Sequence, residues 1–183
     1  MRNALIIGAS GMLSGLVPKL MAQEYQVFAI GRSRERLAAL EEACAPWGPR
    51  LTVMALDYRD TDRLARWVAH IQLLHGPLDA VVAWIHGNPT AVLSAVGQAV
   101  EGYRQFPWDL YHVVGLRASL SPPQPPAGLS HCRYHRIVLG FLEEGARTRW
   151  LSHEEIVQGV YAAFQDQQDR EVGQVRPYAN RPQ

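Results

Sequence analysis

The chain has 183 residues, of which 48% are hydrophobic, and a formal net charge of +1 from 18 basic and 17 acidic side chains. This length and hydrophobic content predict one compact domain with a sizeable core. The balanced charge lacks the basic footprint of a dedicated nucleic-acid-binding protein. The apolar runs are also far shorter than the ~20 residues that a membrane-spanning helix needs. We therefore expect neither a nucleic-acid partner nor a membrane span.

The basic residues are distributed very unevenly, because 17 are arginines and Lys19 is the only lysine. Any mechanism that requires a catalytic lysine therefore has a single candidate. Two cysteines are too few for a disulfide framework and are compatible with a reducing compartment. The first residues lack the apolar run and cleavage site of a signal peptide, so we expect a cytoplasmic protein.

The first hundred residues alternate between short apolar strands and amphipathic helices. Because the strands are continuous apolar runs and helices separate them, the pattern is typical of a parallel sheet that is covered on both faces. The right-handed crossover rule then predicts an α/β fold with a doubly wound, Rossmann-like sheet in one three-layer domain. The predicted strands are 4–7, 26–30, 51–56 and 78–85, and the predicted helices are 12–24, 33–43, 60–74 and 89–100.

The second half of the chain is less regular. Strands are predicted at 110–114 and 136–141, and the proline-rich segment 121–126 between them reads as a stiff, extended connector. Ser152 with Glu155 has the form of a capping box and predicts a final helix to about residue 167. We expect the domain to span 1–170 and the remainder, 171–183, to be a C-terminal tail.

A glycine-rich turn lies directly between the first predicted strand and helix, with the sequence GASGMLSG from Gly8. Gly8 allows a tight turn, and Gly11 lets the backbone approach a phosphate without a Cβ in the way. The N–H groups that follow favour a pyrophosphate. Ser10 can also hydrogen-bond to a phosphate. We therefore expect the turn to bind a dinucleotide cofactor through Gly8, Ser10, Gly11, Met12 and Leu13.

Four segments in this order resemble the short-chain dehydrogenase/reductase family. They are the glycine turn, the sequence GRSRERL at 31–37, LDYRD at 56–60 and DAVVAWIHG at 79–87. The resemblance covers about residues 3–100. It implies that Asp57, with Tyr58 beside it, lies at the adenine, and that Ala83 and Trp84 lie near the nicotinamide.

Arg32 indicates which nicotinamide cofactor the chain prefers. An NAD site places a carboxylate about 20 residues after the glycines, whereas an arginine there accommodates the 2′-phosphate of NADP. No acidic residue ends the second predicted strand, where Arg32 and Ser33 stand instead. A guanidinium binds phosphate through paired, charge-assisted hydrogen bonds. We therefore expect NADP(H) to be preferred over NAD(H).

The resemblance stops at the catalytic residues. The family usually moves the substrate proton with a tyrosine and a lysine four residues later. This chain cannot form that pair, because its only lysine is Lys19 in the first predicted helix. The family's N-N-A-G ending of the fourth strand is also replaced here by Ala-Trp-Ile-His-Gly.

His86 is the leading substitute proton donor, because it follows a strand at the edge where ligands bind in open α/β sheets. Histidine also exchanges protons near neutral pH. Tyr134 and His135 are further catalytic candidates, which we expect to line the substrate pocket. His131 and His135 have a spacing that would suit a metal on a helix, with Cys132 nearby, but no second ligand set accompanies them. We expect no metal site.

The sequence therefore predicts an NADP(H)-dependent oxidoreductase that acts on a small molecule through a non-standard active site. A non-catalytic NADP(H)-binding module for redox sensing or partner binding is the alternative. A flavodoxin-like domain is a third possibility, which Arg32 and the Asp57 segment disfavour. Apolar residues in the later helices favour a homodimer.

Overall fold

Parallel strands form the centre of the molecule. The computed structural model describes residues 1–182, and within them seven parallel strands form one sheet in the order β3-β2-β1-β4-β5-β6-β9. This confirms the predicted doubly wound α/β architecture. The strands are β1 (Arg2–Ile7), β2 (Tyr25–Gly31), β3 (Leu51–Ala55), β4 (Ala80–Trp84), β5 (Trp108–Val114), β6 (Cys132–Leu139) and β9 (Arg170–Val172).

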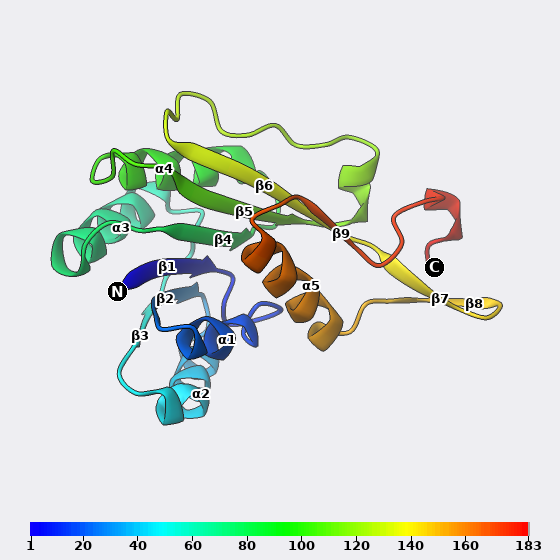
Figure 1. Cartoon of the computed structure of the whole chain (residues 1–183), viewed down its shortest axis with the longest axis horizontal. Helices are drawn as coiled ribbons and strands as arrows, with labels where there is room; N and C mark the ends of the chain where they lie inside the picture. The colour runs from blue at the N-terminus through cyan, green and yellow to red at the C-terminus, as the bar shows by residue number, and fades with distance from the viewer. Residues whose placement is uncertain (183) are drawn as a thin grey trace.

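Helices cover both faces of the sheet (Figure 1). One apolar core joins the sheet to α1 (Leu16–Ala22), α2 (Arg34–Cys44) and α5 (His153–Asp166). A second core joins the other face to α3 (Thr61–His75) and α4 (Pro89–Glu101). Each buried strand therefore packs on both sides, which explains its continuous apolar sequence. Among the described residues, no helix is long and apolar enough to cross a membrane.

Capping side chains define several helix starts. The Asp60 side chain accepts a hydrogen bond from the backbone N–H of Arg63 at the start of α3. Ser152 and Glu155 form both reciprocal bonds of the predicted capping box at α5. These bonds satisfy backbone donors that have no partner within the helix.

The first helix is shorter than predicted. We expected it to begin near residue 12, but α1 begins at Leu16. Residues 8–15 instead form successive turns, with the N–H of Ser14 bonded to the carbonyl of Gly11 and that of Val17 to Ser14. Gly11 and Gly15 lower the helix propensity of this segment, so the chain does not continue the helix through it.

The connection from β5 to β6 contains no α-helix. It consists of the short 3₁₀ helix η2 (Leu116–Ser119) and an extended segment, as the proline-rich sequence predicted. The connection packs directly on α4, because a Cβ at Gly97 would lie 2.5 Å from a methyl carbon of Leu129. β6 begins at Cys132, four residues earlier than expected, so the segment expected to be a loop around Tyr134 and His135 is a strand.

The structure adds a hairpin and a further strand that the sequence did not predict. An antiparallel hairpin, β7 (Phe141–Glu144) and β8 (Arg147–Trp150), projects beyond the sheet (Figure 1). The predicted boundary between domain and tail at 170/171 falls inside β9, which pairs with β6. A third apolar cluster, formed by Leu116, Val138, Phe141 and Val175, then joins η2 to the C-terminal segment. Residues 171–175 therefore belong to the folded domain.

The helix α5 packs closely against the sheet at Gly159. A Cβ at Gly159 would lie 2.5 Å from both methyl carbons of Val172. Alanine favours a helix interior over glycine by about 1 kcal/mol, but overpacking costs about 1–3 kcal/mol. We expect Gly159→Ala to lower the free energy of unfolding in urea. Val172→Ala should remove both methyl contacts and leave only the Cβ of residue 172 at 3.0 Å, so that Gly159→Ala costs less in that background. A stabilising Gly159→Ala in the wild-type background would contradict this packing.

Candidate functional site

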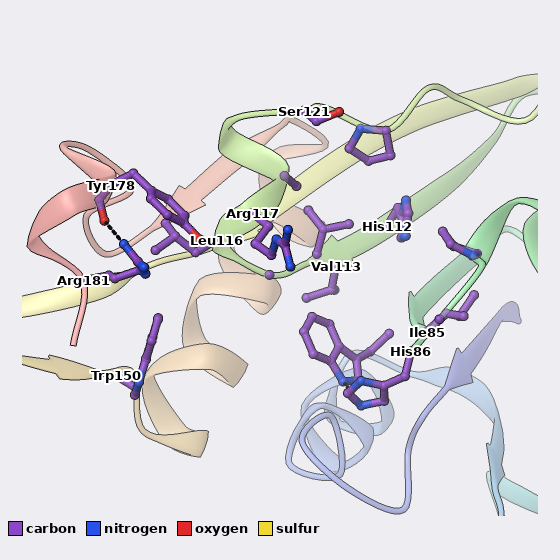
Figure 2. A pocket seen from close by; sticks show the side chains of 17 residues that line it. Ile85, His86, His112, Val113, Leu116, Arg117, Ser121, Trp150, Tyr178 and Arg181 are labelled. Atoms are coloured by element: carbon purple, nitrogen blue, oxygen red, sulfur yellow. Dashed lines mark hydrogen bonds between the residues drawn. The ribbon is translucent and has the colours of Figure 1, made fainter. Parts of the chain in front are cut away.

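A cleft of about 930 Å³ opens at the carboxyl ends of β4 and β5. Ligands bind at this edge in open α/β sheets. Figure 2 shows Ile85 and His86 on one side of the cleft and Trp150, Tyr178 and Arg181 on the other, with Arg117 between them. The C-terminal side of the cleft comes from β8 and from the 3₁₀ helix η3 (Tyr178–Asn180) with the residue that follows it.

The glycine turn lies beside this cleft, after β1. Gly8 has φ +92°, and a Cβ there would lie 3.0 Å from the carbonyl oxygen of Trp84. A side chain at this position would therefore be strained and crowded. The N–H groups of Gly8 and Ala9 both donate to the carbonyl of Ile30, each at 3.0 Å, which fixes the turn against β2.

The turn has the features that a dinucleotide phosphate requires. Within residues 1–182, the backbone N–H groups of Ser10, Met12 and Leu13 have no hydrogen-bond acceptor. A Cβ at Gly31 would lie 2.3 Å from Oγ of Ser10, so the missing side chain of Gly31 makes room for the serine hydroxyl at the end of β2. Leu13 is fully buried in the core, so only its backbone can face a ligand. These residues fit a pyrophosphate bound through backbone donors.

Arg32 and Ser33 follow β2 near the turn. Arg32 is exposed, and Oγ of Ser33 accepts a hydrogen bond from the N–H of Arg36 as the N-cap of α2. The Asp57 carboxylate binds the Arg59 guanidinium at 2.5 Å. The Arg59 hydrogen bonds hold the pKa of Asp57 at about 2. Asp57 is therefore an anion that its own neighbour already neutralises.

Tyr58 and Ala83, two of the predicted cofactor-binding residues, lie close to the loop after β4 but are buried. The backbone N–H of His86 donates to Oη of Tyr58 at 3.1 Å, and the Tyr58 side chain is buried. Ala83 is fully buried, so it can reach a ligand only through its backbone. Tyr58 therefore fixes the backbone at His86, whereas Ala83 offers only its own backbone.

Trp84 and His86 interact directly at the edge of the cleft. The indole Nε1–H donates to Nε2 of His86 at 2.9 Å, and the two rings meet edge to face with their centroids 5.2 Å apart. An Nε2 that accepts this bond carries no proton, so the neutral ring has its proton on Nδ1. His86 is exposed and lines the cleft.

His112 is a cleft residue that the sequence analysis missed. It lies on β5, is 2% exposed and lines the cleft. Burial lowers its pKa to about 4, whereas burial raises the pKa of Tyr134 to about 12. Oη of Tyr134 and Nδ1 of His112 are 2.8 Å apart. A polar residue within the apolar run of β5 is the sequence signal that could have identified it.

Tyr134 and His135 do not meet His86 in the cleft. Tyr134 reaches the cleft only through His112, and His135 lies on the opposite face of the sheet, because successive side chains on a strand alternate. Nε2 of His135 is 2.7 Å from the carboxylate of Asp109, near the amino ends of the strands. The expectation that both residues line the substrate pocket is therefore not met by this geometry.

Asp109 explains why His135 is held at the amino edge. Its carboxylate also accepts hydrogen bonds from Arg133 at 2.6 and 2.9 Å and from Gln167 at 3.1 Å. Burial acts to raise the pKa of Asp109, but the hydrogen bonds from His135 and Arg133 outweigh it and hold the pKa below its usual value. The cluster keeps a buried carboxylate satisfied.

Comparison with known proteins finds one family model that matches just under half of the chain. Residues 2–91 match the family model of the short chain dehydrogenases, which here extends from β1 to the first residues of α4. A search of curated protein sequences gave no match.

Solved structures of this family share the fold of the chain. An alcohol dehydrogenase from the archaeon Thermococcus sibiricus, complexed with 5-hydroxy-NADP, is 15% identical with a TM-score of 0.74, covering 100% of this chain and 99% of that one. A short chain dehydrogenase/reductase from Burkholderia phymatum in complex with NAD is 10% identical with a TM-score of 0.73, covering 97% and 89%. A metagenomic short-chain oxidoreductase in complex with NADP is 19% identical with a TM-score of 0.65, covering 94% and 95%.

The buried His112 should make the protein less stable in mild acid. Its pKa is about 4 in the fold and near 6.5 in the unfolded chain. Below pH 6.5 the unfolded chain therefore binds a proton that the folded protein does not, and stability falls until about pH 4. Between pH 7.5 and pH 5 this costs about 2 kcal/mol. We expect His112→Gln to lack this part of the pH dependence in urea unfolding. Tyr134→Phe, which leaves His112 buried, should retain it. An equal pH dependence in wild type and His112→Gln would contradict the prediction.

Proposed function

We propose that this chain, whose residues 2–91 match the family model of the short chain dehydrogenases, is an oxidoreductase of that family and binds NADP(H) at the glycine turn. It would interconvert a carbonyl and an alcohol in the neighbouring cleft. The observation that carries this proposal is the juxtaposition of two features at one edge of the sheet. Three unpaired backbone donors of the turn lie beside a cleft of about 930 Å³ that contains an exposed histidine.

The proposed cofactor site consists of the turn and the ends of β2 and β3. Backbone N–H groups of Ser10, Met12 and Leu13 would hold the pyrophosphate, and the hydroxyl of Ser10 would reach the ribose at Gly31. The structures in complex with NADP and with NAD show that this fold accepts either cofactor in those proteins. We therefore assign the cofactor of this chain to the nicotinamide dinucleotides. The preference between NADP(H) and NAD(H) depends on the residues of this chain.

Arg32 supports a preference for NADP(H). It is exposed directly after β2, and the Asp57 carboxylate, whose pKa it helps to lower, is already paired with Arg59. The 2′-phosphate of NADP(H) would therefore meet the Arg32 guanidinium and not an unpaired carboxylate. Charge-assisted phosphate binding of this kind is directional and strong.

His86 is the proposed proton donor in the cleft. Bound NADPH would supply a hydride to a substrate carbon, so the chain must supply a proton to the substrate oxygen. The Trp84 indole orients the ring of His86 and leaves its proton on Nδ1. Hydride addition would leave an alkoxide on the substrate, and transfer of the Nδ1 proton to that oxygen would leave an imidazolate, which would take a proton from the water to which the ring is exposed.

The cleft favours catalysis over the alternative of a non-catalytic module. A sensor of NADP(H) needs the glycine turn and Arg32 but has no need for a cleft beside the nicotinamide end. A homodimer and a cytoplasmic location remain predictions from the sequence.

Replacing Arg32 tests the cofactor preference. We expect Arg32→Ala to weaken NADPH binding about 10–100-fold, since a hydrogen bond to a charged group contributes about 1.5–3 kcal/mol. NADH binding should change little. Arg66→Ala, an exposed arginine on α3, serves as the control. Both cofactors are titrated by fluorescence. An unchanged NADPH-to-NADH ratio in Arg32→Ala would remove the role of Arg32, and no binding of either cofactor at millimolar concentration would overturn the cofactor proposal.

Replacing His86 tests the proton donor. We expect His86→Gln to lower kcat by about 10²–10⁴-fold, the usual contribution of general acid catalysis, with NADPH affinity unchanged. Activity is followed at the NADPH absorbance band with a panel of carbonyl and enone substrates. His70→Gln, which changes an exposed histidine on α3, should be silent. Full activity in His86→Gln would show that another group donates the proton.

A further inference from the structure

The side chains that line the cleft carry an excess of positive charge. Its described lining residues include two arginines, Arg117 and Arg181, and no aspartate or glutamate. Within residues 1–182, neither guanidinium forms an ion pair with a carboxylate. The Arg181 guanidinium instead stacks 4.3 Å from the ring centroid of Tyr178 and donates to the carbonyl oxygen of that residue at 3.2 Å. Among the described residues, two cations therefore face the cleft without a compensating carboxylate.

The fold brings these two arginines together from distant parts of the chain. Leu116, which precedes Arg117 in η2, packs against Val138, Phe141 and Val175, and Tyr178 packs on the same cluster. Backbone hydrogen bonds of 2.9 and 2.7 Å between Phe141 and Gln174 tie the C-terminal segment to β7. The positions of Arg117 and Arg181 are thus set by a packed cluster and not by a free tail.

Arg117 lies in the middle of the cleft and Arg181 lies on the side opposite His86. Figure 2 shows Arg117 between His86 and Arg181, with Trp150 and Tyr178 beside Arg181. The remaining surface is mainly apolar, with Ile85 and Val113 near the histidine. A ligand that crosses the cleft would therefore meet an imidazole, then an apolar surface, then a guanidinium.

We propose that the substrate is a carboxylic acid with an apolar body, an oxo acid or its hydroxy acid, whose carboxylate binds Arg117. Arg181 adds positive charge behind it. This inference rests on the proposed oxidoreductase function and names the substrate class for the same cleft. A guanidinium matches a carboxylate with two parallel hydrogen bonds, which would direct the carbonyl at the other end of the ligand toward His86.

Matched acids and esters test the charge recognition without turnover. The probes are 4-oxo-4-phenylbutanoate and 4-oxopentanoate, each compared with its methyl ester, which keeps the body and removes the charge. Binding is measured by calorimetry on the protein alone and on the protein saturated with NADPH. We expect each acid that binds to do so at least about 10-fold more tightly than its ester, with a smaller ratio at high salt because ions screen the interaction.

Variants identify the residues responsible. Arg117→Ala should abolish the preference for the acid, and Arg181→Ala should reduce it. Arg147→Ala changes an exposed arginine of β8 that does not line the cleft, and it should leave the preference intact. Circular dichroism confirms that each variant is folded.

The outcomes separate this inference from the proposed function. Equal affinity for acid and ester in both pairs, no binding of either acid at 10 mM, or a full preference in Arg117→Ala, would overturn the substrate class while NADPH binding could stand. An acid preference that requires Arg117, found in a protein that does not bind NADPH, would support carboxylate recognition and refute the oxidoreductase function.

Discussion

Parallel pairing of every strand in the main sheet is the constraint on which the rest of the structure depends. Because all strands run in one direction, their carboxyl ends meet at one edge, and the turn after β1, the loop after β4 and η2 after β5 become neighbours. Gly8 permits this convergence, since any side chain there would press on the Trp84 carbonyl oxygen. The cofactor turn and the cleft are therefore two consequences of a single backbone arrangement.

The connection from β5 to β6 departs from the usual pattern of a parallel sheet. A parallel pair is usually joined through a helix, but here an extended, proline-containing segment crosses over α4. The only lysine, Lys19, lies on α1 with its Nζ 5.3 Å from the ring centroid of Tyr161 on α5. The described lining of the cleft contains two histidines, His86 exposed at its edge and His112 buried beside it.

Sequence patterns predicted an element correctly where interactions between residues close in the chain determine its structure. The apolar stripe of α3, the capping box of α5 and the glycine turn each depend on residues within one or two helical turns, so their spacing alone indicates them. The start of α1 was predicted too early, because the apolar residues after Gly11 have helical spacing. That spacing gives no sign of the turns that Gly11 and Gly15 favour. β9 was missed because three residues carry too little periodicity to indicate a strand.

The sequence by itself determined the doubly wound sheet, the glycine turn, the candidate phosphate ligand Arg32 and the absence of a tyrosine and lysine pair. These follow from periodicity, from residue type at a turn and from the count of one residue. Only the tertiary structure decided which side chains share the cleft. It moved His135 to the amino edge beside Asp109 and brought His112, Arg117 and Arg181 to the cleft. The reason is that strand alternation and packing between distant segments set these neighbours, and neither leaves a signal within a short stretch of sequence.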